Sequence, residues 1–255
     1  MIQRWASWVF GWVLAGAPAS SAEVFYLDHD AFTGNFVGPV GPLVLSGDIE
    51  PGDYDRLLAK IAADQARFLT QNKIIVASAG GDVREALRIA ALIEALHSSV
   101  SVGPLTGKCA GACFFIYVAA GARGADGEHL LGISRAERND ATPASPVQEK
   151  ALREFLTAYG VPGYLAEEMF RHADDDTYWL TAQDQANLSA KSPAFASYLA
   201  AKCAWDEALE RDANAGRRPI ADLQPMWTCR ERVTRTDAHD ALAAALKSAG
   251  PPRPP

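Results

Sequence analysis

Two glycine-containing turns in the sequence have the composition of sites that stabilise a negatively charged oxygen. Gly80 and Gly81 separate a strand-like run from a helical pattern, and a second turn at 106–112 has the same setting. Backbone N–H groups at a helix start lack partners within the helix, and the helix dipole favours negative charge there. In hydrolases with such a turn, the amide after the nucleophile completes the oxyanion hole. We therefore expect an oxyanion-type cleft lined by the amides of Gly80, Gly81 and Ala112, although two ordinary strand-to-helix turns would look the same.

The four cysteines, Cys109, Cys113, Cys203 and Cys229, are an even number, which favours two disulfides in an exported chain. Three pairings are possible. Cys109 and Cys113 would have Cα atoms about 6 Å apart at a helix start, within disulfide range. A Cys203–Cys229 bridge would hold the C-terminal part of the chain. The spacing is a poor zinc pattern, because no histidine accompanies the pairs, and we expect neither a metal nor a cofactor.

Short apolar runs alternate with helical patterns along the chain. Expected strands cover 24–27, 42–45, 73–77, 100–105 and 130–133. Expected helices cover 51–68, 82–96, 110–120, 147–159 and 162–171. This order is typical of an α/β fold with largely parallel strand pairing.

The N-terminus has the pattern of a cleavable signal peptide. Arg4 precedes an apolar run at 5–15, and small residues follow at 17–22. Ser20 and Ala22 suit the recognition positions of a cleavage after Ala22. The run is shorter than the roughly 20 residues of a membrane span, and no later run is long enough. We therefore expect a periplasmic or secreted protein without a stable membrane span after cleavage.

The rest of the chain divides into one domain and an appendage. We expect the signal peptide at 1–22, an α/β domain at 23–200, a helical extension at 201–249 and a disordered proline-rich tail at 250–255. The formal net charge of −7 disfavours a nucleic-acid partner, which requires basic surfaces. No cluster of Lys or Arg indicates an anionic membrane surface.

Several motifs appear in the order found in one superfamily. They are Leu45-Ser-Gly-Asp-Ile-Glu, Ser78-Ala-Gly-Gly-Asp-Val-Arg-Glu-Ala, Cys109-Ala-Gly-Ala-Cys, Gly121-Ala-Arg, Leu131-Gly-Ile-Ser and Tyr178-Trp-Leu-Thr-Ala-Gln-Asp-Gln-Ala-Asn-Leu. Across roughly 40–190 the chain resembles the Clp-protease/crotonase superfamily, and in particular exported Clp-protease-like proteins of bacteria. The resemblance implies a spiral of ββα units around a Ser-His-Asp site, here followed by a C-terminal helical extension.

The catalytic positions that the resemblance implies are altered. Gly111 stands where working members have the nucleophilic serine of Cys-x-Ser-Ala-Cys, and Ser134 stands where they have the histidine base. The acidic member falls in the run Asp174-Asp175-Asp176, with Asp174 as the candidate and its neighbours as alternatives. Because glycine cannot attack a carbonyl and serine is no general base near neutral pH, the covalent route is lost. Backbone donors survive such changes, so the resemblance implies a binding or assembly protein that takes a peptide or a small carbonyl or carboxylate ligand.

Three further possibilities follow. A displaced set formed by Cys109, His172 and Asp174 would give an active hydrolase or peptidase. Acyl-thioester chemistry of the crotonase kind also uses paired amides, but coenzyme A substrates are not expected outside the cytoplasm. Members of the superfamily commonly form oligomers, which makes a second copy of this chain a candidate partner.

Overall fold

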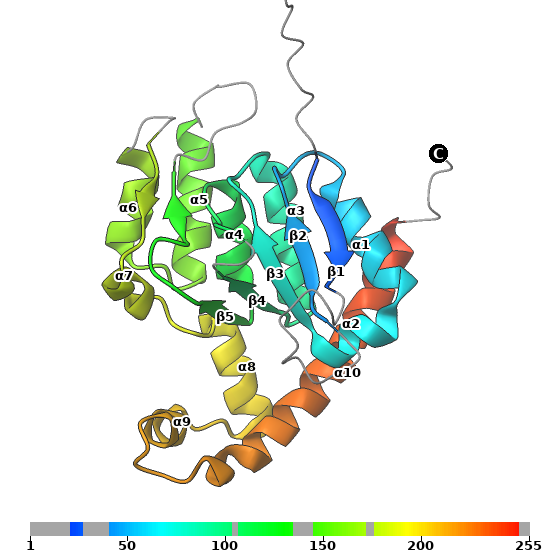
Figure 1. The fold of residues 1–255 in the computed structure, drawn as a ribbon, viewed down its shortest axis with the longest axis vertical. Coiled ribbons are helices and arrows are strands. Elements are labelled where there is room, and N and C mark those ends of the chain that lie inside the picture. Colours follow the sequence, from blue (N-terminus) through cyan, green and yellow to red (C-terminus); the bar gives the residue numbers. More distant parts are fainter. Residues whose placement is uncertain (1–20, 28–40, 104–106, 135–144, 172–175, 250–255) are drawn as a thin grey trace, which may run out of the picture.

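A computed structural model describes residues 21–27, 41–103, 107–134, 145–171 and 176–249 of the chain (Figure 1). Within these residues the centre of the molecule is a five-stranded sheet in the order β1-β2-β3-β4-β5. The strands are β1 (Glu23–Tyr26), β2 (Leu43–Ser46), β3 (Lys73–Ala77), β4 (Ser99–Val102) and β5 (Ala122–Ala125). Strands β2 to β5 are parallel neighbours, and β1 pairs antiparallel with β2. The expected α/β fold with largely parallel pairing is confirmed.

Helices make the connections that parallel strands require. They are α1 (Asp53–Ala63) and α2 (Gln65–Gln71) between β2 and β3, α3 (Val83–Ala95) between β3 and β4, and α4 (Ala112–Ala119) between β4 and β5. The single helical pattern expected over 51–68 is divided at Asp64, whose side chain accepts the Arg67 N–H and starts α2. Every residue of α4 is buried, which explains its unbroken apolar sequence.

Hydrogen bonds at the start of α3 cap that helix and connect it to the start of α1. The Asp82 side chain caps α3 by accepting the Glu85 N–H at 2.8 Å. Glu85 is itself buried, and its Oε1 accepts the N–H groups of Gly52 at 3.0 Å and Tyr54 at 2.8 Å. One carboxylate therefore satisfies amides at the start of α1 and fixes that helix against α3.

A second, smaller set of pairings continues past the carboxyl ends of the central strands. Isolated parallel bridges join Ile49 to Gly81, Ser78 to Cys109, and Cys109 to Leu131. The chain then forms β6 (Gly132–Ile133), which pairs antiparallel with β7 (Tyr178–Trp179). This layer contains both turns singled out in the sequence.

The remaining helices all come from the second half of the chain. They are α5 (Pro146–Ala158), α6 (Gly163–Arg171), α7 (Ala182–Asn187), α8 (Pro193–Cys203), α9 (Glu207–Asn214), the short 3-10 helix η2 (Ile220–Leu223) and α10 (Gln224–Ala249). Figure 1 shows α10, in orange and red, running from beside α9 back along α2 and α1. None of the helices in the described part of the chain is both long and apolar enough to cross a bilayer.

Residues of the C-terminal helices form a hydrophobic cluster separate from the main core. It contains Phe195, Leu199, Trp205, Ala213, Leu223 and Met226. A Cys203–Cys229 disulfide, with Cα atoms 5.6 Å apart, joins α8 to α10. Further along α10, Ala238 and Leu242 are buried in the main core. The long helix is thus held by the disulfide near one end and by packing near the other.

Candidate functional site

The two glycine-containing turns lie side by side. The Ser78 N–H donates to the Lys108 carbonyl oxygen at 2.8 Å, and the Ala110 N–H donates to the Ser78 carbonyl oxygen at 3.0 Å. These bonds pair the chain that follows β3 with the chain that precedes α4. Two segments far apart in the sequence therefore meet at the carboxyl ends of the parallel strands, where α/β folds commonly place their ligands.

Gly111 has a backbone conformation that residues with side chains rarely adopt, with φ +52° and ψ −123°. A Cβ built on Gly111 would lie 2.9 Å from Ser134 Oγ and 3.4 Å from the Ala79 carbonyl oxygen. The two positions at which the resemblance implies nucleophile and base are therefore adjacent in space. The groups present there are a glycine and a serine hydroxyl.

The three amides expected to line the cleft differ in their hydrogen bonding. The Gly80 N–H donates to Ser78 Oγ at 3.1 Å, and that hydroxyl also donates to the Gly80 carbonyl oxygen at 3.0 Å. Within the described residues, the N–H groups of Gly81 and Ala112 have no acceptor. The Gly80 N–H is therefore occupied by a hydrogen bond within its own turn. A Cβ on Gly80 would lie 3.4 Å from the Ala112 nitrogen, so glycine lets the two turns approach.

A disulfide spans the turn that carries Gly111. Cys109 and Cys113 are bonded, with Cα atoms 5.3 Å apart, and both are fully buried. While this bond is formed, Cys109 cannot act as the nucleophile of a displaced hydrolase site, because a disulfide sulfur is neither a thiol nor a thiolate. The other members of that set, His172 and Asp174, lie outside the described residues.

Two residues of the segment around β7, Thr177 and Trp179, lie next to the turns. Lys108 Nζ lies 4.2 Å from the centre of the Trp179 ring, a cation–π contact that joins the turn to β7. Thr177 and Ala110 both lie against Gly132, since a Cβ built on Gly132 would be 2.6 Å from Cγ2 of Thr177 and 3.0 Å from Cβ of Ala110. The pairing of β6 with β7 brings Thr177 and Trp179 to the site, and the local sequence does not predict that pairing.

Asp184 fixes the segment that carries β7. Its carboxylate accepts hydrogen bonds from the hydroxyls of Tyr164 at 2.8 Å, Tyr178 at 2.9 Å and Thr181 at 2.8 Å, and from the Thr181 N–H at 3.0 Å. Burial acts to raise the pKa of Asp184, but these hydrogen bonds outweigh it and hold the pKa below its ordinary value. The ionised carboxylate thereby joins α6, β7 and α7.

Across the described part of the chain, no three His, Cys, Asp or Glu side chains are grouped in a way that could hold a metal ion. The groups that the structure places at the turns are backbone amides, the hydroxyls of Ser78 and Ser134, the ammonium group of Lys108 and a disulfide.

No known family model and no curated protein matches the sequence. Several solved structures are similar in fold. ClpP1 from Listeria monocytogenes is 15% identical, with 58% of this chain and 86% of that chain covered and a TM-score of 0.42. A membrane-bound stomatin-specific protease is 16% identical, covering 64% and 83%, with a TM-score of 0.40. An enoyl-CoA hydratase from Thermoplasma volcanium is 15% identical, covering 88% and 96%, with a TM-score of 0.36. At these identities the likeness concerns the fold alone.

Proposed function

We propose that this chain is an exported binding or assembly protein that keeps a hydrolase-like backbone frame without peptidase chemistry. The observation that carries the proposal is the contact between Gly111 and Ser134. The resemblance implies that a nucleophile and a base meet at these two positions. Glycine supplies no nucleophile, and a serine hydroxyl does not accept a proton near neutral pH.

The open amides of Gly81 and Ala112 indicate the ligand chemistry. Gly81 lies just before the capping residue of α3, and Ala112 is the first residue of α4. Two N–H groups for which no described residue is an acceptor would each donate to an oxygen atom. The ligand is therefore a peptide carbonyl or a small carboxylate, bound without being cleaved.

Export is part of the proposal, and the cysteines support it. All four are oxidised, in the pairs Cys109–Cys113 and Cys203–Cys229. Disulfides persist outside the cytoplasm, where thiols are not kept reduced. The signal-peptide pattern and the oxidised cysteines thus favour the same compartment. Detection of the mature chain in a periplasmic or culture fraction, beginning at Glu23, would test this part directly.

The activity test uses a fluorophosphonate probe, which labels activated serines, together with casein and a nitrophenyl ester. We expect the wild-type protein to show no labelling or turnover above a heat-denatured sample. Labelling that disappears in a Ser134→Ala variant would overturn the proposal, because Ser134 would then be a nucleophile. Turnover that appears only after reduction and is lost in Cys109→Ala would instead support the displaced hydrolase.

A gain-of-function variant shows whether the frame can support chemistry. Gly111→Ser with Ser134→His places a hydroxyl and an imidazole at the two adjacent positions. The backbone at Gly111 has the positive φ typical of strained nucleophile turns. Labelling of this double variant but not of Gly111→Ser alone would show that positions 111 and 134 can hold a nucleophile and its base in working geometry. Circular dichroism of each variant controls for loss of fold.

A further inference from the structure

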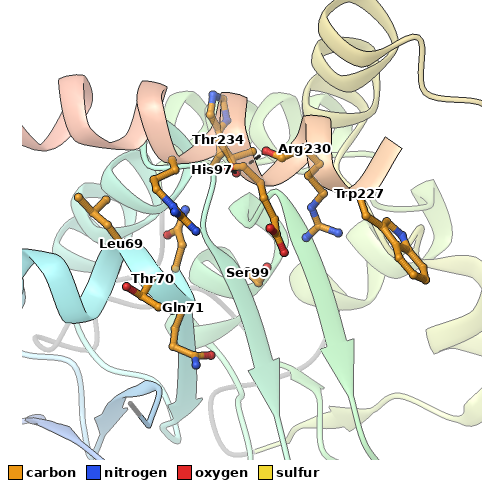
Figure 2. A pocket seen from close by; sticks show the side chains of 11 residues that line it. Leu69, Thr70, Gln71, His97, Ser99, Trp227, Arg230 and Thr234 are labelled. Carbon is orange, nitrogen blue, oxygen red and sulfur yellow. Dashed lines mark hydrogen bonds between the residues drawn. The ribbon is translucent and has the colours of Figure 1, made fainter. Parts of the chain in front are cut away.

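A pocket of about 350 Å³ lies at the end of the sheet opposite the two turns (Figure 2). Its walls come from the end of α2, the turn between α3 and β4, and one side of α10. Ser99, the first residue of β4, lies in its wall, whereas the turns follow the carboxyl ends of the strands. The pocket is therefore separate from the proposed oxyanion cleft and does not depend on the function proposed for it.

Arg230 is the charged side chain that distinguishes this pocket. Figure 2 shows it extending from α10 toward Ser99. In the part of the chain that the structure describes, its guanidinium makes no hydrogen bond and no ion pair, and its ring contact is with Phe195, 5.8 Å from the ring centre. None of its nitrogens is among the fully buried side-chain atoms without a partner in the described residues, so the five N–H donors of this guanidinium are open to water or to a ligand that enters the pocket.

The surroundings of Arg230 disfavour its positive charge. Burial lowers the pKa of the guanidinium, and the charges of Glu210 and Glu231 only partly offset this. Arg123 is more deeply buried and donates from Nη2 to the Tyr159 carbonyl oxygen at 2.7 Å, while its Nε and Nη1 have no hydrogen-bond partner among the described residues. Arg123 thus keeps one protein acceptor, whereas in the same part of the chain Arg230 has none and lies in the wall of a pocket.

The other walls suit an organic anion. Arg235 adds a second positive charge and Glu231 one negative charge, so the three charged residues of the wall sum to one positive charge. Gln71 and Ser99 supply polar groups, while Leu69 and Trp227 supply apolar surface. Arginine recognises carboxylates and phosphates through paired hydrogen bonds. A volume of about 350 Å³ is in the range of small-molecule sites and exceeds the needs of an inorganic ion.

We propose that this pocket binds a small organic anion, with a carboxylate or phosphate group on Arg230 and an apolar body against the wall formed by α2 and α10. The neighbouring Cys203–Cys229 disulfide holds the part of α10 that carries Arg230. The site therefore exists only while the C-terminal helices are fixed against the α/β domain.

The test measures binding of phenyl phosphate, benzoate, neutral benzamide and inorganic phosphate to the full chain with intact disulfides, by calorimetry. We expect phenyl phosphate or benzoate to bind more tightly than benzamide. Arg230→Gln should weaken that binding by about tenfold or more, the effect of losing hydrogen bonds to a charged group. Arg232→Gln, an exposed arginine on the same helix outside the pocket wall, should leave binding within about twofold, which is a small change in free energy. Absence of anion binding, or equal losses in both variants, would overturn the proposal.

A second measurement separates a binding role from a structural one. Because no residue in the described part of the chain accepts a hydrogen bond from Arg230, Arg230→Gln should unfold at the same temperature as wild type or at a higher one. A binding residue often costs stability in this way. A lower unfolding temperature of the ligand-free variant would show that Arg230 holds the fold together, and would overturn the proposal.

Discussion

The two ends of the parallel sheet build their surfaces from different parts of the chain. At the carboxyl ends, Gly80, Gly81 and Gly111 form a surface of backbone atoms, and their positive φ values leave little place for side chains. At the opposite end, the pocket is made of side chains, and Arg230 and Trp227 come from a helix that follows the domain in sequence. One end is fixed by the sheet itself, and the other by a helix packed onto it.

The two ends of the sheet should therefore respond differently to amino-acid substitutions. A backbone surface depends on bridges such as Ile49–Gly81 and Ser78–Cys109, and a single added methyl group disturbs them. A side-chain surface survives most substitutions, but it is lost when the helix that carries it moves. Substitutions at the turns should therefore cost mainly stability, and substitutions in the pocket mainly binding.

The largest effect is expected at Gly81. A Cβ on this residue would overlap the Ile49 carbonyl oxygen and lie 2.7 Å from the Ile49 nitrogen, and φ is +125°. Gly81→Ala should lower the free energy of unfolding by about 4 kcal/mol or more, since it combines a backbone clash with a disfavoured conformation. Urea denaturation followed by circular dichroism measures the loss.

Gly216→Ala is the matched control. This glycine also has a positive φ, +71°, but a Cβ there would have nothing within 4 Å. Its cost should be only about 1 kcal/mol, the conformational penalty alone. Similar losses in the two variants would mean that the close contact with Ile49 contributes little, and the contrast between the two ends would weaken.

The two disulfides should differ in how much they stabilise the protein. Cys203 and Cys229 are 26 residues apart, so their bridge closes a long loop, and replacing both by alanine should cost about 3 kcal/mol in the chain-entropy model. Cys109 and Cys113 are only 4 apart, and the corresponding loss is about 2 kcal/mol. Thermal or urea unfolding of the two double variants measures this order.

The two disulfides should also differ in their effect on the binding of phenyl phosphate, because only Cys203–Cys229 lies near the pocket. The Cys203/Cys229 double variant should bind it more weakly, because α10 is released near Arg230. The Cys109/Cys113 double variant should bind it as wild type does. Equal binding by both variants would show that packing alone places α10.

The two glycine-containing turns at the carboxyl ends of the strands were easier to predict from the sequence than the pocket at the opposite end. Gly80 and Gly81 between a strand and a helix, and Asp82 at the helix start, are local signals, and the structure confirms the strand, the cap and the turn. The sequence did not show that Ser78 occupies the Gly80 amide, because that bond depends on the conformation of a single turn. The adjacency of Gly111 and Ser134 was implied only by the family resemblance.

Other features could not be predicted because they arise from pairing at a distance. The edge strand β5 is not predicted, since Ala122-Arg-Gly-Ala has none of the branched or aromatic residues that indicate strands. β7 was missed because two residues give no periodicity. The pocket needs α10 to fold back onto α2, and nothing in the local sequence of α10 specifies that contact.

A smaller effect is expected at Asp184, which anchors the segment next to the turns. Asp184→Asn should cost about 2 kcal/mol near pH 7, because an amide cannot accept four hydrogen bonds as the carboxylate does. The lowered pKa of Asp184 means that its contribution is complete above the ordinary aspartate pKa, about 3.9, and is lost as pH falls through the lowered value. The exposed Asp222 supplies the control variant Asp222→Asn.

Unfolding free energies of these variants between neutral and strongly acidic pH test the assignment. The gap between wild type and Asp184→Asn should be widest near neutral pH and should narrow on acidification. Asp222→Asn should follow wild type throughout. A constant gap would show that the carboxylate charge is not what holds β7 in place.

The smallest effect is expected at Lys108, the exposed residue of the turn that contacts Trp179. Lys108→Gln should lower the free energy of unfolding by about 0.5 kcal/mol, the worth of an exposed cation–π contact. Lys150→Gln, which removes an exposed ion pair with Glu154, should change it by about zero. If Lys108→Gln instead cost as much as Asp184→Asn, this side chain would be a structural support of the turn. The end of the sheet that we describe as built from backbone would then depend on a side chain as the pocket does.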